Sequence, residues 1–197
     1  KKYELSIIED AAHAFGGKYK KKYLGTIGDL GTFSFHQTKN IIGGQAGAIS
    51  VNNKKFIYNV KIQLDKGTDR QDFLLGKNKK KFYQWQGIGS EYRCPELSAA
   101  VLEADLSNIK KKFNIRSSLW KLYYNELVEI IKTSSISLQS IPKNCNSPFH
   151  NFCLILKNTN QRKLFIKFLK NKGIQATTHY YALHKSNFGK NFLNKKI

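Results

Sequence analysis

Apolar and polar residues follow one another along the chain in short runs, and glycine separates many of these runs. Short apolar or alternating runs between turn-forming residues are typical of β-strands, whereas apolar residues three or four positions apart are typical of amphipathic helices. The sequence predicts strands over 5–9, 32–36, 48–51, 151–156 and 174–179. It predicts helices over 54–64, 96–106, 110–131 and 161–170. Strands that alternate with helices and glycine turns predict an α/β sheet.

Two stretches depart from this pattern. Lys and Tyr alternate over 18–24, which predicts a hairpin at a sheet edge. The stretch 67–88 is polar but rich in aromatic residues, which need packing partners, so it is interpreted as a long ordered loop. The composition changes again around Pro142, and the strand-helix-strand pattern after it predicts a second, smaller domain.

The composition allows a sizeable core but no membrane span. The chain has 197 residues, of which 41% are hydrophobic, yet no apolar run approaches the roughly 18 residues that cross a bilayer. The first residues do not resemble a secretion signal, because their apolar run is short and leads into Glu9 and Asp10; this favours the cytoplasm. Cys94, Cys145 and Cys153 form no CxxC pair, which disfavours both a disulfide framework and a zinc site and indicates a reducing compartment.

The formal charge of +21 raises the possibility of nucleic-acid binding. Lysines account for nearly all of it and are spread along the whole chain, whereas Arg occurs only at positions 70, 93, 116 and 162. Arg is the preferred side chain for bidentate recognition of bases and phosphates, so a nucleic-acid function is disfavoured. Attraction of an anionic small molecule such as a nucleotide diphosphate is compatible with the charge.

Three groups of residues have types suited to chemistry. Asp10 ends the first predicted strand, where it can pair with a cationic ring nitrogen, bind a metal, act as a base, or simply cap a helix. The segment 34–40 combines Ser and Thr, which can hold a phosphate, with Lys39, whose amine can bond an aldehyde if burial or neighbours deprotonate it. His179 and His184 follow the last predicted strand and can contact a polar substrate or serve as structural histidines; a metal pair is disfavoured.

These segments, taken together, resemble the DegT/DnrJ/EryC1/StrS family of sugar aminotransferases, which depend on pyridoxal 5'-phosphate (PLP). Within that family the resemblance is greatest to transaminases that form dTDP-4-amino-4,6-dideoxygalactose. The segments that carry it are IIEDAAHAFGG (7–17), LGTIGDLGTFSFHQTKNI (24–41), DKGTDRQDFLLG (65–76), WQGIGSEYRCPELSAA (85–100) and HYYALH (179–184). The second segment is the most specific, because its order, spacing and residue types all match the cofactor-lysine motif.

The resemblance implies a fragment of a fold type I PLP-dependent transferase, similar to aspartate aminotransferase, with a three-layer sheet domain and the start of a small α+β domain. Residues 1–109 would form the C-terminal part of the large PLP-binding domain, 110–133 a connecting helix, and 134–197 an incomplete small domain. The implied reaction moves an amino group from glutamate to a nucleotide-linked 4-keto-6-deoxy sugar of the dTDP-4-dehydro-6-deoxyglucose type, for cell-surface polysaccharide or lipopolysaccharide synthesis. The relatives are homodimers with shared active sites, and neither nucleic acid nor membrane is an expected partner.

The resemblance also assigns roles to individual residues. Lys39 matches the lysine that binds the cofactor covalently, and Asp10 matches the carboxylate that pairs with its ring nitrogen. His13 would lie beside the cofactor ring and Ser34 would contact its phosphate, with Asn40 as a further cofactor contact. The remaining assignments are a partner-subunit phosphate contact for Arg93 and substrate contacts for His36, Tyr92, His179 and Tyr180. No metal ligand is implied.

The sequence departs from the family pattern in two turns. Gln45 and Ala46 stand where relatives usually have Glu and Gly, and Lys21 stands where a turn glycine is frequent. An inactive truncated remnant or a non-catalytic relative therefore stays an alternative to the enzyme. A dehydratase, in which His replaces the cofactor lysine, is disfavoured because Lys39 is present.

Overall fold

The fold is described from a computed structural model, which covers residues 3–193. The contacts divide the chain into two compact units. The first contains the chain up to Leu127 together with Gln139–Cys153, and the second contains Val128–Leu138 and the chain from Leu154 onward. The predicted domain boundaries at 109 and 133 stay a prediction.

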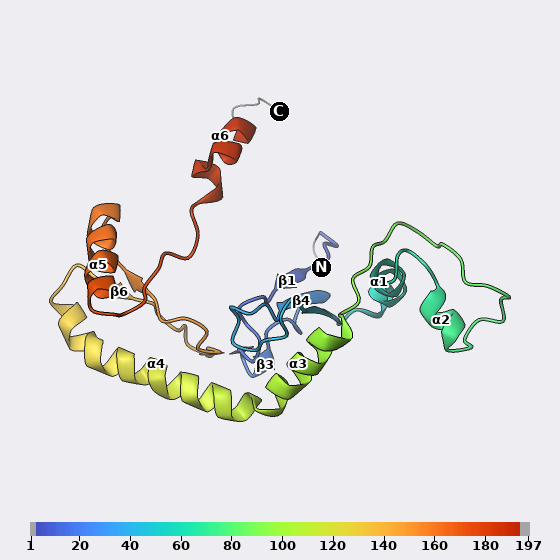
Figure 1. The fold of residues 1–197 in the computed structure, drawn as a ribbon, viewed down its shortest axis with the longest axis horizontal. Helices are drawn as coiled ribbons and strands as arrows, with labels where there is room; N and C mark the ends of the chain where they lie inside the picture. Colours follow the sequence, from blue (N-terminus) through green and yellow to red (C-terminus); the bar gives the residue numbers. More distant parts are fainter. Residues whose placement is uncertain (1–2, 194–197) are drawn as a thin grey trace. The chain divides into compact units, whose positions relative to one another are not determined.

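A three-stranded sheet organises the first unit (Figure 1). Its strands are β1 (Ile8–Asp10), β4 (Leu30–Ser34) and β5 (Gly47–Val51), in the order β1-β4-β5. β1 and β4 run parallel, whereas β4 and β5 are antiparallel. The predicted strands 5–9, 32–36 and 48–51 therefore exist, with bounds shifted by a few residues, and the α/β fold class is confirmed.

The loop before β4 is fixed by a carboxylate that accepts several of its backbone N–H groups. Glu9 lies in β1, and its carboxylate accepts backbone N–H groups from Gly25 at 2.9 Å, Ile27 at 2.5 Å and Gly28 at 2.6 Å. Burial of this carboxylate raises its pKa, but the three N–H groups lower it more, so that the net pKa lies below the usual value. The carbonyl of Gly25 lies directly over the Cα of Gly31, where no side chain would fit.

A small antiparallel sheet joins the hairpin of β2 (Lys18–Tyr19) and β3 (Lys22–Tyr23) to β7 (Cys145–Asn146). This confirms the predicted hairpin. Its two turn residues, Lys20 and Lys21, have φ angles of 45° and 67°. Since the left-handed region disfavours residues other than glycine, the turn explains why a glycine is the expected residue at position 21.

The remaining elements of the first unit are mostly helices. They are η1 (Lys54–Phe56), α1 (Ile57–Leu64), α2 (Arg70–Leu74), α3 (Glu96–Ser107) and α4 (Ile109–Lys132), the last of which continues into the second unit. Three predicted helices are thereby confirmed, and the predicted loop 67–88 contains α2. Among the described residues, the fully covered apolar side chains are Ala11, Phe35, Ile41 and Ile62.

The second unit begins with the antiparallel pair β6 (Ser137–Leu138) and β8 (Leu154–Ile155). It continues with α5 (Thr159–Asn171), η2 (Leu183–Lys185) and α6 (Asn187–Leu193). The predicted helix 161–170 is confirmed and begins with an N-cap, because the Asn158 side chain accepts the Gln161 N–H at 2.9 Å. The predicted strand 174–179 is wrong: this segment has no ladder partner among residues 3–193, and an extended segment becomes a strand only through such pairing.

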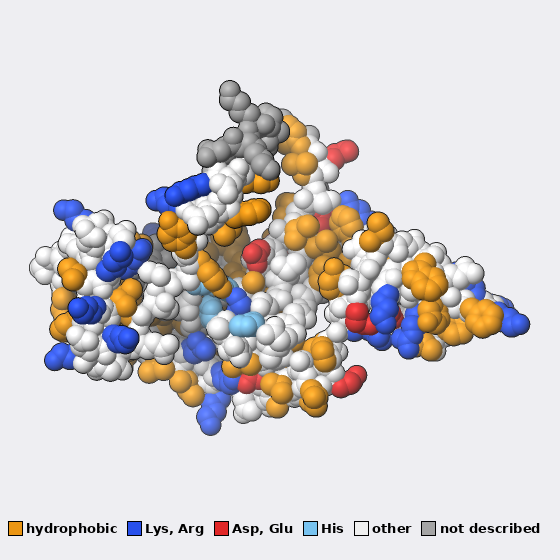
Figure 2. Space-filling view, turned by 45° about the horizontal axis from the view of Figure 1, so that its top comes forward, with side chains coloured by type: hydrophobic (Ala, Val, Ile, Leu, Met, Phe, Trp, Pro, Cys, Tyr) orange, Lys and Arg blue, Asp and Glu red, His pale blue; other side chains and the backbone are white. Residues whose placement is uncertain are grey.

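Lys and Arg side chains appear at several separate places on the surface seen in Figure 2, as the spread of the lysines along the sequence predicts. Cys94, Cys145 and Cys153 are free thiols. Within the part of the chain that the structure describes, no helix combines the length and the apolar character needed to cross a bilayer. In the same range, no three or more His, Cys, Asp or Glu side chains form a group suited to a metal ion.

Candidate active site

The parallel pairing of β1 and β4 places two predicted site residues at one edge of the sheet. Asp10, the last residue of β1, lies opposite Thr32, and Ser34 is the last residue of β4. The Ala11 N–H then donates to the Thr32 carbonyl at 2.9 Å. Because the carboxyl ends of both strands face the same way, the segments 11–17 and 35–42 leave the sheet at the same edge, where open α/β sheets bind ligands.

A buried amide ties these two segments together. Asn40 is 3% exposed, and its side-chain N–H₂ donates to the Phe15 carbonyl at 3.3 Å. Its neighbour Ile41 is completely buried. The residue immediately after Lys39 is therefore anchored in the fold, which gives Asn40 a structural contact in addition to its predicted cofactor contact.

Lys39 lies at the end of a tight turn. Its backbone N–H donates to the His36 carbonyl at 2.8 Å, and its side chain is half-buried. Among residues 3–193, its amine makes no hydrogen bond or ion pair. The turn is supported by the His36 ring, whose Nδ1 accepts the Thr38 backbone N–H at 3.3 Å and lies 3.0 Å from the Thr38 hydroxyl. His36 therefore stabilises the lysine turn, while its substrate contact stays a prediction.

Ser34 and Asp10 both make local contacts that leave acceptor capacity. The Ser34 hydroxyl accepts the His36 N–H at a long 3.4 Å. Oδ1 of Asp10 accepts the Ala12 N–H at 3.1 Å, which shapes the turn after β1. No helix follows Asp10, since residues 12–16 form a turn, so the alternative of a helix cap does not apply. The Asp10 carboxylate is exposed at the sheet edge.

His13, the residue predicted beside the cofactor ring, pairs with a second histidine. The ring centroids of His13 and His150 are 4.7 Å apart in an edge-to-face arrangement. His150 could not be predicted from the sequence, since it belongs to a distant segment with no recognisable motif. Its ring contact with His13 links it to the site.

Arg93 is engaged by carboxylates of its own chain. Its Nε and Nη2 donate to the Glu91 carboxylate at 2.8 and 3.1 Å, and Asp65 lies 3.9 Å from Nε. The guanidinium of Arg93, followed by the ammonium of Lys66, lowers the pKa of Glu91 to about 2, and Glu91 in turn raises the pKa of Arg93. Tyr92, next to it, is 68% exposed. Tyr92 and Arg93 both lie at the surface. A phosphate bound by Arg93 would compete with the Glu91 carboxylate for the same guanidinium.

His179 and Tyr180 belong to the second unit. Their rings contact each other edge to face, with centroids 4.5 Å apart, and Tyr180 is largely exposed. Their assignment to the sugar-nucleotide site stays a prediction.

The altered turn at Gln45 and Ala46 closes in the structure. The Phe35 N–H donates to the Ala46 carbonyl at 2.8 Å, and the Gly43 N–H donates to the Phe35 carbonyl at 2.7 Å. Gly44 takes a φ of 70°, and Gln45 points to solvent. Ala46 packs against Gly43, where a Cβ would lie only 3.0 Å from the Ala46 methyl. The extra methyl is thus accommodated by a neighbouring glycine.

The backbone just after the Lys39 turn is held by a residue of helix α3. Oδ2 of Asp105, in α3, accepts the Ile42 N–H at 2.8 Å, and its other oxygen pairs with the Lys112 ammonium in α4. Burial raises the pKa of Asp105, but the bonds from Lys112 and Ile42 lower it more, so the net pKa lies below the usual value. The sequence analysis missed Asp105, because a single acid in an amphipathic helix is an ordinary surface residue.

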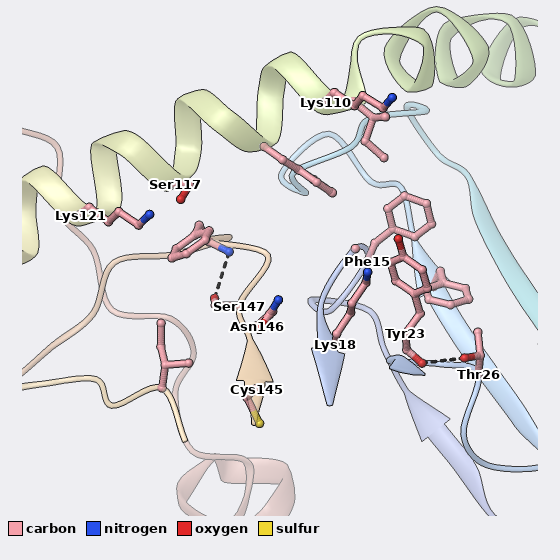
Figure 3. Close-up of a pocket in the computed structure, with 16 residues that line it drawn as sticks. Phe15, Lys18, Tyr23, Thr26, Lys110, Ser117, Lys121, Cys145, Asn146 and Ser147 are labelled. Atoms are coloured by element: carbon pink, nitrogen blue, oxygen red, sulfur yellow. Dashed lines mark hydrogen bonds between the residues drawn. The ribbon is translucent and has the colours of Figure 1, made fainter. Parts of the chain in front are cut away.

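A pocket of about 870 Å³ lies elsewhere in the first unit, between the hairpin, α4 and the β7 segment (Figure 3). Phe15, Phe113 and Phe149 give it an apolar lining, and Lys18 and Lys121 lie at its border. None of the predicted site residues lines it. This pocket and the predicted chemistry therefore have different linings.

Comparisons with known proteins identify relatives along nearly the whole sequence. The family model described as the DegT/DnrJ/EryC1/StrS aminotransferase family matches residues 1–196. GDP-perosamine synthase of Escherichia coli O157:H7 is 30% identical over 187 residues, which cover 93% of this chain and 47% of that protein. UDP-4-amino-4,6-dideoxy-N-acetyl-beta-L-altrosamine transaminase of Campylobacter jejuni is 27% identical over 201 residues, covering 99% and 50%. The chain thus spans about half the length of these curated relatives.

A solved structure has the same fold. Spr1654 of Streptococcus pneumoniae in its PLP form aligns with a TM-score of 0.80 at 20% identity, over 95% of this chain and 47% of that one.

Proposed function

Because the chain belongs to the DegT/DnrJ/EryC1/StrS aminotransferase family, we propose that it carries the cofactor-binding part of a PLP-dependent sugar-nucleotide aminotransferase. The observation that supports this most is the parallel pairing of β1 and β4, after which the Asp10 and Lys39 segments leave the sheet at one edge. The residues there fit PLP: a carboxylate at a strand end, a nearby hydroxyl, and an amine that makes no hydrogen bond or ion pair within residues 3–193.

In this proposal each residue at the edge has one task. Lys39 would hold the cofactor through its amine, and the same amine, when free, would move the proton at the α-carbon of the amino donor. The Asp10 carboxylate would pair with the protonated ring nitrogen, and Ser34 would offer a hydroxyl to the phosphate. His13 would lie beside the ring. PLP, when bound, supplies an electron sink for the carbanion chemistry of amino transfer.

The substrate we propose is a nucleotide-linked 4-keto-6-deoxy sugar, with glutamate as amino donor. The name of the Campylobacter relative, which has an amino group at C4 of a 6-deoxy sugar, supports this position of transfer. The dTDP carrier stays a proposal, since the names of the two relatives reported above contain GDP and UDP instead. A homodimer in the cytoplasm, with the Tyr92 region reaching the partner's site, completes the proposal.

The test is covalent capture of the cofactor. The 197-residue chain is incubated with PLP, reduced with borohydride and digested, and the labelled lysine is identified by mass spectrometry. We expect a visible absorption band and a label at Lys39, both lost in Lys39→Ala. Lys54→Ala, which changes an exposed lysine of η1, is the matched control and should keep both.

Two results would decide against this assignment. A label spread evenly over the surface lysines, or a band that persists in Lys39→Ala, would favour the non-catalytic alternative. Glutamate should bleach the band if the amino donor is correct, because it converts the cofactor to its amine form.

A further inference from the structure

The backbone just after Lys39 is fixed by two polar side chains that do not belong to its own turn. The buried Asn40 amide donates to the Phe15 carbonyl, and two positions further on the Ile42 N–H donates to the Asp105 carboxylate. Asp105 is separated from Ile42 by 63 positions in the sequence. The contact therefore transmits the position of α3 directly to the segment that carries the lysine.

The Asp105 contact is stronger than an ordinary surface hydrogen bond. Its side chain is 17% exposed, and the Lys112 ammonium balances its charge from α4. Hydrogen bonds to charged acceptors contribute more than neutral ones, and a half-buried geometry limits competition by water. The bond from Ile42 to Asp105 is thus a specific anchor, whereas Lys39 itself has no side-chain partner that could hold its amine.

We propose that Asp105 is a positioning residue, which fixes the Lys39 segment through the Ile42 backbone so that the lysine amine is presented to the cofactor. This inference rests on the proposed function of Lys39. Without the anchor, the segment 39–42 would sample other conformations, and the amine would be more exposed to solvent but less often in the position for capture.

Loss of the anchor should lower the capture of PLP by Lys39 but raise the exposure of its amine to solvent. These opposite changes distinguish positioning from a general loss of stability. In Asp105→Ala we expect PLP to label Lys39 with an apparent affinity reduced about tenfold, the change that corresponds to the loss of one charge-assisted hydrogen bond. At the same time, labelling of Lys39 by acetic anhydride, which needs no cofactor site, should rise about fivefold relative to the other lysines. Global unfolding would instead raise the acetylation of all lysines together.

Two further variants test the hydrogen bond itself. Asp105→Asn keeps an oxygen that can accept the Ile42 N–H and should restore both labelling rates to within about threefold of the original chain. Asp72→Ala is the matched control, because Asp72 also pairs with a lysine, at 3.3 Å, but does not contact the Lys39 segment. It should change neither rate. Amide hydrogen exchange over 39–43 should increase in Asp105→Ala alone.

The proposal is overturned if Asp105→Ala captures PLP like the original chain, or if Asp105→Asn is as defective as Asp105→Ala. If Asp105→Ala fails to fold, Asp105→Glu takes its place, because it keeps the charge beside Lys112 but displaces the carboxylate from the Ile42 N–H; it should show the same loss of PLP capture and gain of acetylation at Lys39, and unchanged values would overturn the proposal. If the original chain takes no label at Lys39, the proposed function fails. Acetylation of Lys39 and amide exchange then decide the positioning role alone, and unchanged values in Asp105→Ala would overturn it.

Discussion

Two regions of the first unit use their acidic residues in different ways. Around the lysine edge, which comprises β1, β4, β5 and their loops, carboxylates accept backbone N–H groups: Glu9 from the 25–28 loop, Asp29 from Ile7, and Asp105 from Ile42. Within the outer segment, defined as 65–92, carboxylates pair mainly with cationic side chains. Those pairs are Asp65–Arg70, Asp69–Lys80 and Glu91–Lys66.

Aromatic side chains differ in the same way. At the lysine edge, Phe15 packs edge to face on Phe33 and Phe35, with centroids 5.5 and 5.2 Å away. In the outer segment, Phe82 and Trp85 are 67% and 76% exposed, and Figure 2 shows hydrophobic side chains gathered on this part of the surface. The lysine edge is thus held mainly by backbone hydrogen bonds to carboxylates and by packed rings, whereas the outer segment depends more on charge pairs, which salt screens.

The largest effect is expected from a methyl group inside the lysine edge. In Gly31→Ala the new Cβ would overlap the Gly25 carbonyl, a backbone atom that cannot move away. We expect a loss of about 3 kcal/mol in the free energy of unfolding, from overpacking and backbone displacement. Gly87→Ala, in the outer segment, is the control, because a Cβ there meets no atom within 4 Å. Urea denaturation of both variants measures the difference; equal losses would contradict the comparison.

A smaller effect is expected from replacing the Glu9 carboxylate, which binds the backbone of the loop 25–28. Glu9→Gln keeps the shape, but its single oxygen can accept only the Ile27 and Gly28 N–H groups, through weaker neutral bonds, and its NH₂ faces the Gly25 N–H, a donor against a donor. This change should cost about 2 kcal/mol. Since folding lowers the pKa of Glu9, its stabilisation is fully present above the usual value of 4.5 and is lost as the pH falls through the folded-state pKa. The unfolding free energy should therefore depend less on pH below 4.5 in Glu9→Gln than in the original chain. An unchanged pH dependence would contradict this prediction.

The outer segment should respond to salt instead. The Asp69 carboxylate binds Lys80 at 2.7 Å, the Gln84 N–H at 2.7 Å and the Gln86 amide at 3.2 Å, and the Lys80 bond followed by the Gln84 N–H lowers its pKa. Asp69→Asn should increase amide exchange over 80–86 and leave 30–36 unchanged. High salt should have the same local effect on the original chain, because it screens the pair with Lys80. If amide exchange increased over both 80–86 and 30–36, the two regions would unfold together and the prediction would fail.

Local pattern was sufficient to predict much of the lysine edge. The apolar runs around β1, β4 and β5 and the acid at the end of β1 are short-range signals, so these three strands could be inferred from them. The family resemblance then assigned a role to one lysine among many. The strand expected at 174–179 was wrong, because an extended pattern does not reveal whether a pairing partner exists.

Contacts between distant segments could not be predicted. The anchor from Asp105 to Ile42, the pairing of His13 with His150 and the insertion of Glu9 under its loop each join residues whose relation depends on the folded backbone. The aromatic residues of the outer segment follow the expected packing only in part: Phe73 and Tyr83 contact each other, with ring centroids 6.1 Å apart, whereas Phe82 and Trp85 are exposed. The hydrogen bonds of buried Asp69, which the pattern of aromatic residues did not indicate, also hold the segment.

The smallest effect is expected from the most prominent side chain of the outer segment. Trp85 is large, but it leaves most of its surface in water, and hydrophobic stabilisation scales with the area removed from water. Trp85→Ser should therefore change the unfolding free energy by less than about 0.5 kcal/mol, as for other surface substitutions. Phe35→Leu, which changes a 4% exposed ring at the lysine edge, should cost about 1 kcal/mol or more in the same denaturation experiment. If Trp85→Ser costs as much as Phe35→Leu, the outer aromatic residues contribute to the folding of this chain itself, and the contrast between the two regions is lost.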